Sequence, residues 1–69
     1  MDRESEIRNL KRIIKELDFA RDNSLSLRNL SKRDERFKRE MEKLTKRIHD
    51  SIFLATAIKE TIEKEGENK

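Results

Sequence analysis

Apolar residues recur at helical spacing over the first third of the chain. Between residues 5 and 21 they return every three or four positions. At 100° per residue such positions share one side of a helix. Glu4 and Glu6 lie in the first turn, where carboxylates complement the helix dipole. The spacing therefore predicts a helix over residues 5–21, whose apolar face consists of Ile7, Leu10, Ile13, Ile14, Leu17 and Ala20.

The apolar pattern loses its phase over residues 22–26. Asp, Asn and Ser dominate this segment, and their side chains favour turns and helix N-caps because they bond to nearby backbone. We expect a turn here, with Ser24 or Ser26 as the next N-cap and Ser31, followed by Asp34, as a second candidate. The apolar series of the first helix, continued at the same interval, reaches only Arg21, Ser24, Arg28 and Ser31.

A second apolar stripe follows over residues 27–49 and predicts a helix antiparallel to the first. A single long helix stays open as an alternative, because no Gly or Pro precedes Gly66. The seven-residue series that starts at Ile13 would then form a parallel coiled coil. That series places Asp34 in the seam, so the hairpin is favoured. The stripe of the second helix consists of Leu27, Leu30, Phe37, Met41, Leu44 and Ile48.

The segment after residue 50 is apolar on more than one side. A helix of that kind is normally buried all round, so we expect a second copy of the chain or a partner to cover it. The alternative is a short third helix, capped by Asp50 or Ser51, that folds back on the hairpin. The helix or its continuation is expected over residues 51–65, with Gly66 as C-cap and a frayed tail over 66–69. The predicted oligomer interface is Ile48, Ile52, Phe53, Leu54, Ala57, Ile58 and Ile62.

The composition supports an oligomer. The chain has 69 residues, 32% hydrophobic and 48% charged, and it contains no Cys. Such a short chain forms one domain and buries too little surface to be more than marginally stable. Disulfides and thiolate metal sites are excluded, which leaves oligomerisation as the usual remedy. The expected fold is a single all-α domain over residues 1–69, a helical hairpin with a possible third helix that dimerises into a bundle.

The charges are unevenly distributed. Residues 28–47 carry nine basic and four acidic side chains, although the net charge of the chain is only +3. Seven of these cations fall within an arc of about 100° on the predicted helix, along about 28 Å. Such a strip could contact phosphates or an acidic protein. It could equally be a solvated face with ion pairs Glu35–Arg39 and Glu42–Lys46. The strip consists of Arg28, Lys32, Arg36, Arg39, Lys43, Lys46 and Arg47.

Residues that could support catalysis or metal binding are scarce. His49 is the single His, and no second metal ligand lies three or four residues from it. No Ser has a partner typical of a nucleophile, and one Gly cannot make a phosphate-binding loop. We therefore expect no enzyme activity, no metal and no cofactor.

The predicted function is that of a non-catalytic oligomerising regulator or adaptor, whose partners are itself and another protein. The alternative is sequence-nonspecific binding of a nucleic-acid backbone, duplex RNA or DNA, by a basic helix face of a dimer. A membrane partner is disfavoured by the acidic residues and the absence of Trp. An intracellular protein, cytoplasmic or nuclear, is expected, with no signal or membrane-spanning segment. Phe19 is expected to pack on the turn near Leu25, or else to contact a partner.

Overall fold

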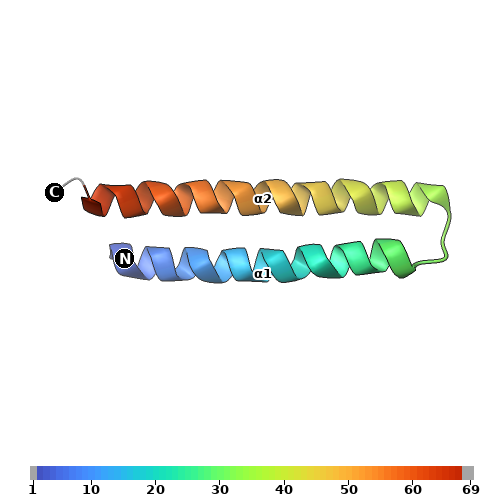
Figure 1. Cartoon of the computed structure of the whole chain (residues 1–69), viewed down its shortest axis with the longest axis horizontal. Helices are drawn as coiled ribbons and strands as arrows, with labels where there is room; N and C mark the ends of the chain where they lie inside the picture. Colours follow the sequence, from blue (N-terminus) through green and yellow to red (C-terminus); the bar gives the residue numbers. More distant parts are fainter. Residues whose placement is uncertain (1, 68–69) are drawn as a thin grey trace.

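The computed structural model describes residues 2–67 as two antiparallel helices packed side by side (Figure 1). Helix α1 spans Arg3–Leu30, helix α2 spans Glu35–Glu67, and residues 31–34 join them. The hairpin measures 55 × 15 × 14 Å, with both chain ends at the same end of the rod (Figure 1). The predicted all-α hairpin is confirmed, and the single long helix is excluded.

The turn does not lie at residues 22–26, where the sequence pattern placed it. That segment continues α1, and the helix ends only at Leu30. Ser24 is not an N-cap but is buried, at 5% exposure, between the helices. Its hydroxyl lies 2.6 Å from the Thr45 hydroxyl of α2. The Ser24 hydroxyl is thus hydrogen-bonded to the other helix, so Ser24 can be buried within α1 without forming a turn.

The observed turn is built by Ser31 and Asp34. Ser31 is the C-cap of α1; its N–H donates to the carbonyl of Leu27 at 3.0 Å, and its hydroxyl accepts from the N–H of Arg33 at 3.1 Å. The Asp34 carboxylate accepts from the N–H of Phe37 at 3.0 Å and so caps the start of α2. The two residues considered as a second candidate cap therefore form the connection, with Asp34 rather than Ser31 as the N-cap.

Helix α2 continues without a break through Asp50 and Ser51, so these residues do not start a third helix. Ser51 caps nothing; its hydroxyl donates to the Arg47 carbonyl one turn back at 2.9 Å. Gly66 is helical and is not the C-cap of α2. Of the predicted frayed tail, residues 68–69 lie outside the described part of the chain.

The helices meet along a seam with coiled-coil spacing. Ser24 faces Thr45, and the guanidinium of Arg3 lies against Gly66. The two residue numbers of each pair add up to 69, so one register runs along the whole hairpin. In this register, successive seam positions on each helix are separated by three and four residues in turn, as in a coiled coil. The seam positions, all half-buried or buried, are Ile7, Leu10, Ile14, Leu17, Arg21, Ser24 and Arg28 of α1 and Met41, Thr45, Ile48, Ile52, Ala55, Lys59 and Ile62 of α2.

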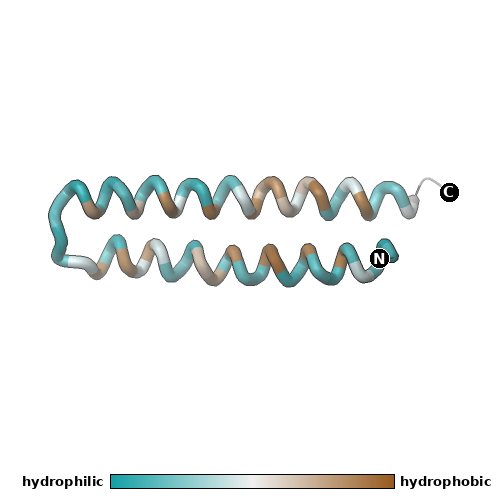
Figure 2. The backbone as a smooth tube through the Cα atoms, turned by 180° about the vertical axis from the view of Figure 1, so that it is seen from behind, coloured by the Kyte–Doolittle hydropathy of each residue, from teal (hydrophilic) through white to brown (hydrophobic). Residues whose placement is uncertain are grey.

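The core that this seam provides is thin. Met41 and Ala55 are the only buried apolar residues in the described part of the chain, and no large side chain there is fully buried. Hydrophobic positions recur along both helices in Figure 2, but a two-helix hairpin covers only one stripe of each helix. Large apolar side chains therefore stay exposed at Ile13, Phe19, Leu27, Leu30, Leu44, Phe53, Leu54 and Ile58.

Candidate interaction surfaces

One flank of the seam is polar, and its carboxylates are paired within the hairpin. We call it the polar flank: the residues that immediately follow every second seam residue, Lys11, Asp18 and Leu25 of α1 and Glu42, His49, Thr56 and Glu63 of α2. Three cations of the seam turn toward this flank and form ion pairs with its carboxylates. The pairs are Arg21–Asp18 at 3.3 Å, Arg28–Glu42 at 2.8 Å and Lys59–Glu63 at 2.9 Å.

The opposite flank is apolar. It is formed by residues that immediately precede the other seam residues, those at 14, 21 and 28 of α1 and at 45, 52 and 59 of α2, and positions of this kind on two antiparallel helices fall on the same side. Their four large side chains keep between 45% and 51% of their surface exposed. Leu54 extends the surface outward on α2, at 61% exposure. The apolar flank consists of Ile13, Ala20 and Leu27 of α1 and Leu44, Ser51, Leu54 and Ile58 of α2.

Large and small side chains alternate along the apolar flank. Ile13 and Ile58 lie toward the chain ends, and Leu27 and Leu44 lie toward the turn. The small side chains of Ala20 and Ser51 lie between these two pairs. The 14 residues from Ile13 to Leu27 correspond to about 21 Å of helix. The flank is therefore a narrow strip with two bulky ends and a low centre.

The structure divides the predicted oligomer interface into two groups. Ile48, Ile52 and Ile62 belong to the seam and pack against α1. Phe53, Leu54, Ala57 and Ile58 are exposed, and Phe53 keeps 76% of its surface exposed. Within the second group, Leu54 and Ile58 lie on the apolar flank, whereas the 100° spacing puts Phe53 on the side of the polar flank.

The predicted basic strip is split between the two helices. Arg28 belongs to α1, where it pairs with Glu42, and Lys32 belongs to the turn. Lys43 pairs with Glu40 at 3.4 Å. Of the strip, the exposed residues on α2 are Arg36, Arg39, Lys43, Lys46 and Arg47, over about 16 Å of helix.

The two ion pairs expected along α2 are replaced by others. Glu35 lies 3.9 Å from Lys38 rather than beside Arg39, and Glu42 pairs with Arg28 rather than with Lys46. Among the residues that the structure describes, none forms an ion pair with Arg39 or Lys46. The same holds for Arg36 and Arg47.

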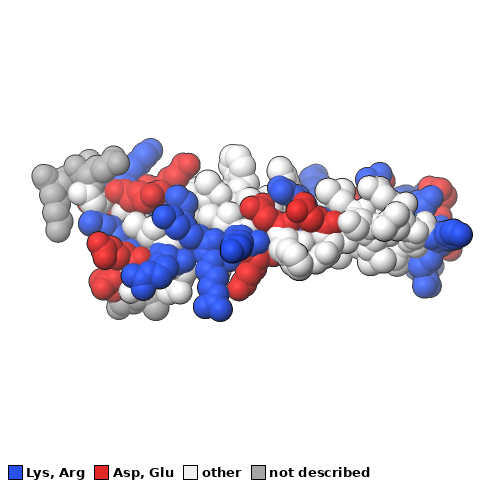
Figure 3. All heavy atoms as spheres, turned by 60° about the horizontal axis from the view of Figure 1, so that its bottom comes forward, with Lys and Arg blue, Asp and Glu red and all other residues white. Residues whose placement is uncertain are grey.

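A second group of cations lies on α1. In the face shown in Figure 3, Lys and Arg gather over the N-terminal half of α1, and an uncharged area lies next to the turn. Arg12 pairs with Glu16 at 3.4 Å. The exposed cations of this half are Arg3, Arg8, Lys11, Arg12 and Lys15.

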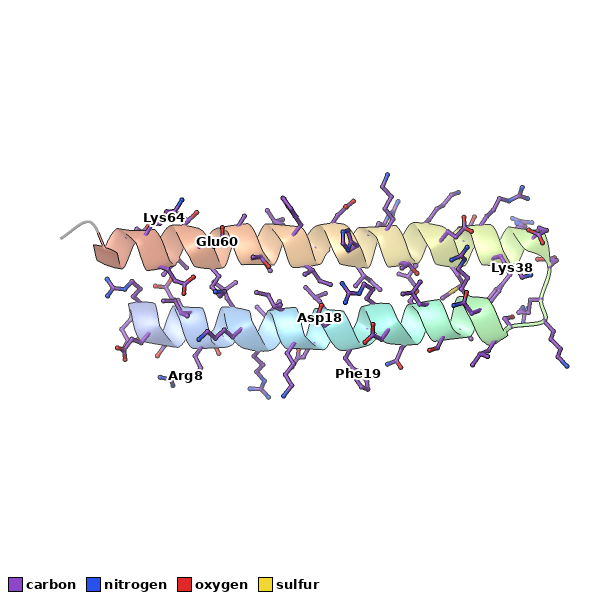
Figure 4. The ribbon with its side chains drawn as sticks, in the orientation of Figure 1. Arg8, Asp18, Phe19, Lys38, Glu60 and Lys64 are labelled. Atoms are coloured by element: carbon purple, nitrogen blue, oxygen red, sulfur yellow. The ribbon has the colours of Figure 1, made fainter. Side chains whose placement is uncertain are left out.

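Phe19 does not pack on a turn, because the turn is not near it. Its ring points away from α2 (Figure 4) and keeps 70% of its surface exposed. It lies in a shallow depression whose other lining residues are all charged: Arg12, Lys15, Glu16, Asp18 and Asp22. By contrast, Phe37 at the turn is half-buried under the guanidinium of Arg33, 5.1 Å from the ring centre.

The described residues offer no cluster of three or more His, Cys, Asp or Glu side chains that could hold a metal ion. His49 lies on the polar flank and is exposed. Neither α1 nor α2 contains an apolar stretch long enough to cross a bilayer over the residues described. Comparisons with protein-family models, with curated proteins and with solved structures find no match to this chain.

Proposed function

We propose that this chain is a non-catalytic interaction module that self-associates into a helical bundle and acts as an adaptor or regulator by binding protein. The observation that supports this proposal is the contrast between the two flanks. The carboxylates of the polar flank are paired with seam cations, whereas the apolar flank faces solvent with four half-exposed aliphatic side chains. A surface of that kind is typical of a protein–protein interface.

The energetics of the hairpin support the same proposal. Each Å² of apolar surface removed from water contributes about 25 cal/mol, and the seam removes little, since no large side chain in the described chain is fully buried. Arg21, Ser24 and Arg28 occupy the seam near the turn, so that half adds still less apolar burial. Covering the apolar flank would add its five large aliphatic side chains to the eight large apolar side chains of the seam.

Sedimentation equilibrium tests the proposed self-association. The proposal predicts a mass of twice 8.3 kDa for the wild type. Leu44→Gln, on the apolar flank, should shift the equilibrium toward the monomer by about tenfold or more, since it hydrates a side chain of the interface. The matched control is His49→Gln on the polar flank, which should leave the mass unchanged. A wild-type monomer at every concentration would refute the proposed self-association.

A second candidate function is backbone binding of duplex nucleic acid. The observation that favours it is the set of exposed cations on α2 that form no ion pair with any described residue, Arg36, Arg39, Lys46 and Arg47. A salt titration tests it, because the logarithm of the binding constant falls by about 0.9 per phosphate contact for each tenfold rise in salt. The double variant Arg39→Gln/Lys46→Gln should reduce that slope by about 2. Absence of binding at low salt would exclude this candidate.

A further inference from the structure

We infer that the apolar flank is covered by a second copy of this chain that runs in the opposite direction, with the turn of each copy over the chain ends of the other. This inference rests on the self-association proposed above, and adds which face is buried and how the two copies are oriented. The symmetry of the apolar flank and the charges at the two ends of the hairpin support it.

The apolar flank is symmetric about its own centre. Two bulky pairs, Ile13 with Ile58 and Leu27 with Leu44, lie at similar distances on either side of the low centre. A two-fold axis through that centre, perpendicular to the helices, turns the strip end for end. It sets each bulky pair of one copy against the other bulky pair of its partner. Both apolar flanks are then buried in one two-fold interface.

The centre of the flank allows the two copies to approach closely. Ala20 and Ser51 carry the smallest side chains of the strip, and the axis crosses the two helices at these two residues. Ser51 does not need a partner across the interface, because its hydroxyl already donates to the Arg47 carbonyl. Each of these two positions would face the same position of the other copy, so small residues meet where the helices are nearest.

The charges at the two ends of the hairpin favour the opposite orientation. At the end with both termini, residues 2–9 and 60–66 contain six carboxylates and three cations. At the turn end, residues 28–43 contain seven cations and four carboxylates. Two copies that run in opposite directions bring an acidic end beside a basic end at both ends of the bundle. Copies with both turns at the same end would bring like charges together, which raises the free energy of that arrangement.

Disulfide trapping tests which face is buried in the dimer. The chain has no Cys of its own, so an introduced Cys can form a disulfide only with its counterpart in another copy. In the proposed arrangement, Ser51→Cys lies beside its own counterpart, within the roughly 7 Å between Cα atoms that a disulfide needs. We expect Ser51→Cys to form a covalent dimer under mild oxidation. The matched control is His49→Cys, which is also exposed on α2 but lies on the polar flank and should stay monomeric on a non-reducing gel.

The outcomes separate this inference from the proposed function. Cross-linking of His49→Cys as readily as Ser51→Cys would overturn the assignment of the face. Failure of both to cross-link, with a wild-type dimer by sedimentation, would overturn the arrangement and leave self-association intact. A wild-type monomer would instead refute self-association itself.

Spin labels at Lys32→Cys test the direction. Lys32 lies in the turn, about 18 Å along the helix axis from the centre of the apolar flank. With the turns at opposite ends, the two labels should lie about 36 Å apart along the bundle. A distance within about 20 Å, set by neighbouring helix axes, would show that both turns lie at the same end and would overturn the inference.

Discussion

At the scale of single residues, the hairpin depends on polar side chains that satisfy one another inside the seam. Thr45 donates its hydroxyl hydrogen to the Met41 carbonyl at 2.8 Å, so in the 2.6 Å contact with Ser24 the donor is Ser24. Both hydroxyls are thereby satisfied away from bulk water. A buried pair of this kind contributes little net stability, but leaving one member without its partner is costly.

A double-mutant cycle tests whether the Ser24 and Thr45 hydroxyls are coupled. Thr45→Val leaves the Ser24 hydroxyl without its acceptor and should lower the free energy of unfolding by about 1–3 kcal/mol. Ser24→Ala should lower it by about 1 kcal/mol. Urea unfolding at one fixed protein concentration should show that the double variant loses about 1 kcal/mol less than the sum of the two. Additive losses would mean that the two hydroxyls are not coupled.

The first residue of the described chain carries a pH-dependent contact. Asp2 caps α1, and the backbone N–H of Ser5 donates to its carboxylate at 2.7 Å. That bond, with a further contribution from the Ser5 side chain and from the charge of Arg8, lowers the pKa of Asp2 below the ordinary 3.8. A lowered pKa means that the contact stabilises the fold above the ordinary pKa, and that this contribution is lost as the pH falls through the pKa of the folded state.

Carboxyl-carbon NMR through an acid titration measures this directly. The Asp2 midpoint should lie below 3.8 in the folded chain. A midpoint at or above that value would show that the cap is not formed in solution.

At the scale of the elements, periodicity was sufficient to predict two antiparallel helices but not where they join. Polar side chains replace apolar ones from Arg21 onward, but the seam positions continue through Ser24 and Arg28, and α1 continues to Leu30. Polar residues can occupy seam positions when the facing helix supplies a hydrogen bond or an ion pair. A single sequence does not show that facing partner, so the burial of Ser24 could not be predicted from it.

The sequence pattern also merged two surfaces into one apolar face. Ile13 and Ile14 were placed together, although Ile14 lies in the seam and Ile13 on the apolar flank. In α2, Leu44 belongs to the predicted apolar stripe, but the adjacent Thr45 occupies the seam and Leu44 lies on the apolar flank. The strict alternation of three and four residues, applied to both helices in one register, separates the seam from the flank. That register becomes known only when one cross-helix contact is known.

The N-cap of α2 gives a test at this scale. Asp34→Ala removes the acceptor for the Phe37 N–H and should lower the free energy of unfolding by about 1 kcal/mol. Asp34→Asn keeps a side-chain oxygen at the same place and serves as the control, with a loss well below that of Ala. The measurement is thermal unfolding followed by circular dichroism at constant protein concentration. Equal losses for both variants would show that the Asp34 side chain is not the cap.

At the scale of the whole molecule, the hairpin has the features of half a bundle. Its seam holds two helices in register, its polar flank is closed by ion pairs, and its apolar flank stays open. In the proposed dimer, Phe19 and Phe53 remain outside the interface and offer apolar contacts to a further protein. Self-association and partner binding would then use different sides of the same hairpin.

The concentration dependence of unfolding tests this account most directly. If folding is completed by a second copy, dilution favours the unfolded monomer, and the thermal midpoint must rise with protein concentration. We predict a steady rise of the wild-type midpoint across a hundredfold range of concentration, with a much weaker rise for Leu44→Gln. A wild-type midpoint that stays constant over that range would show that the two helices are stable alone, and would contradict the account.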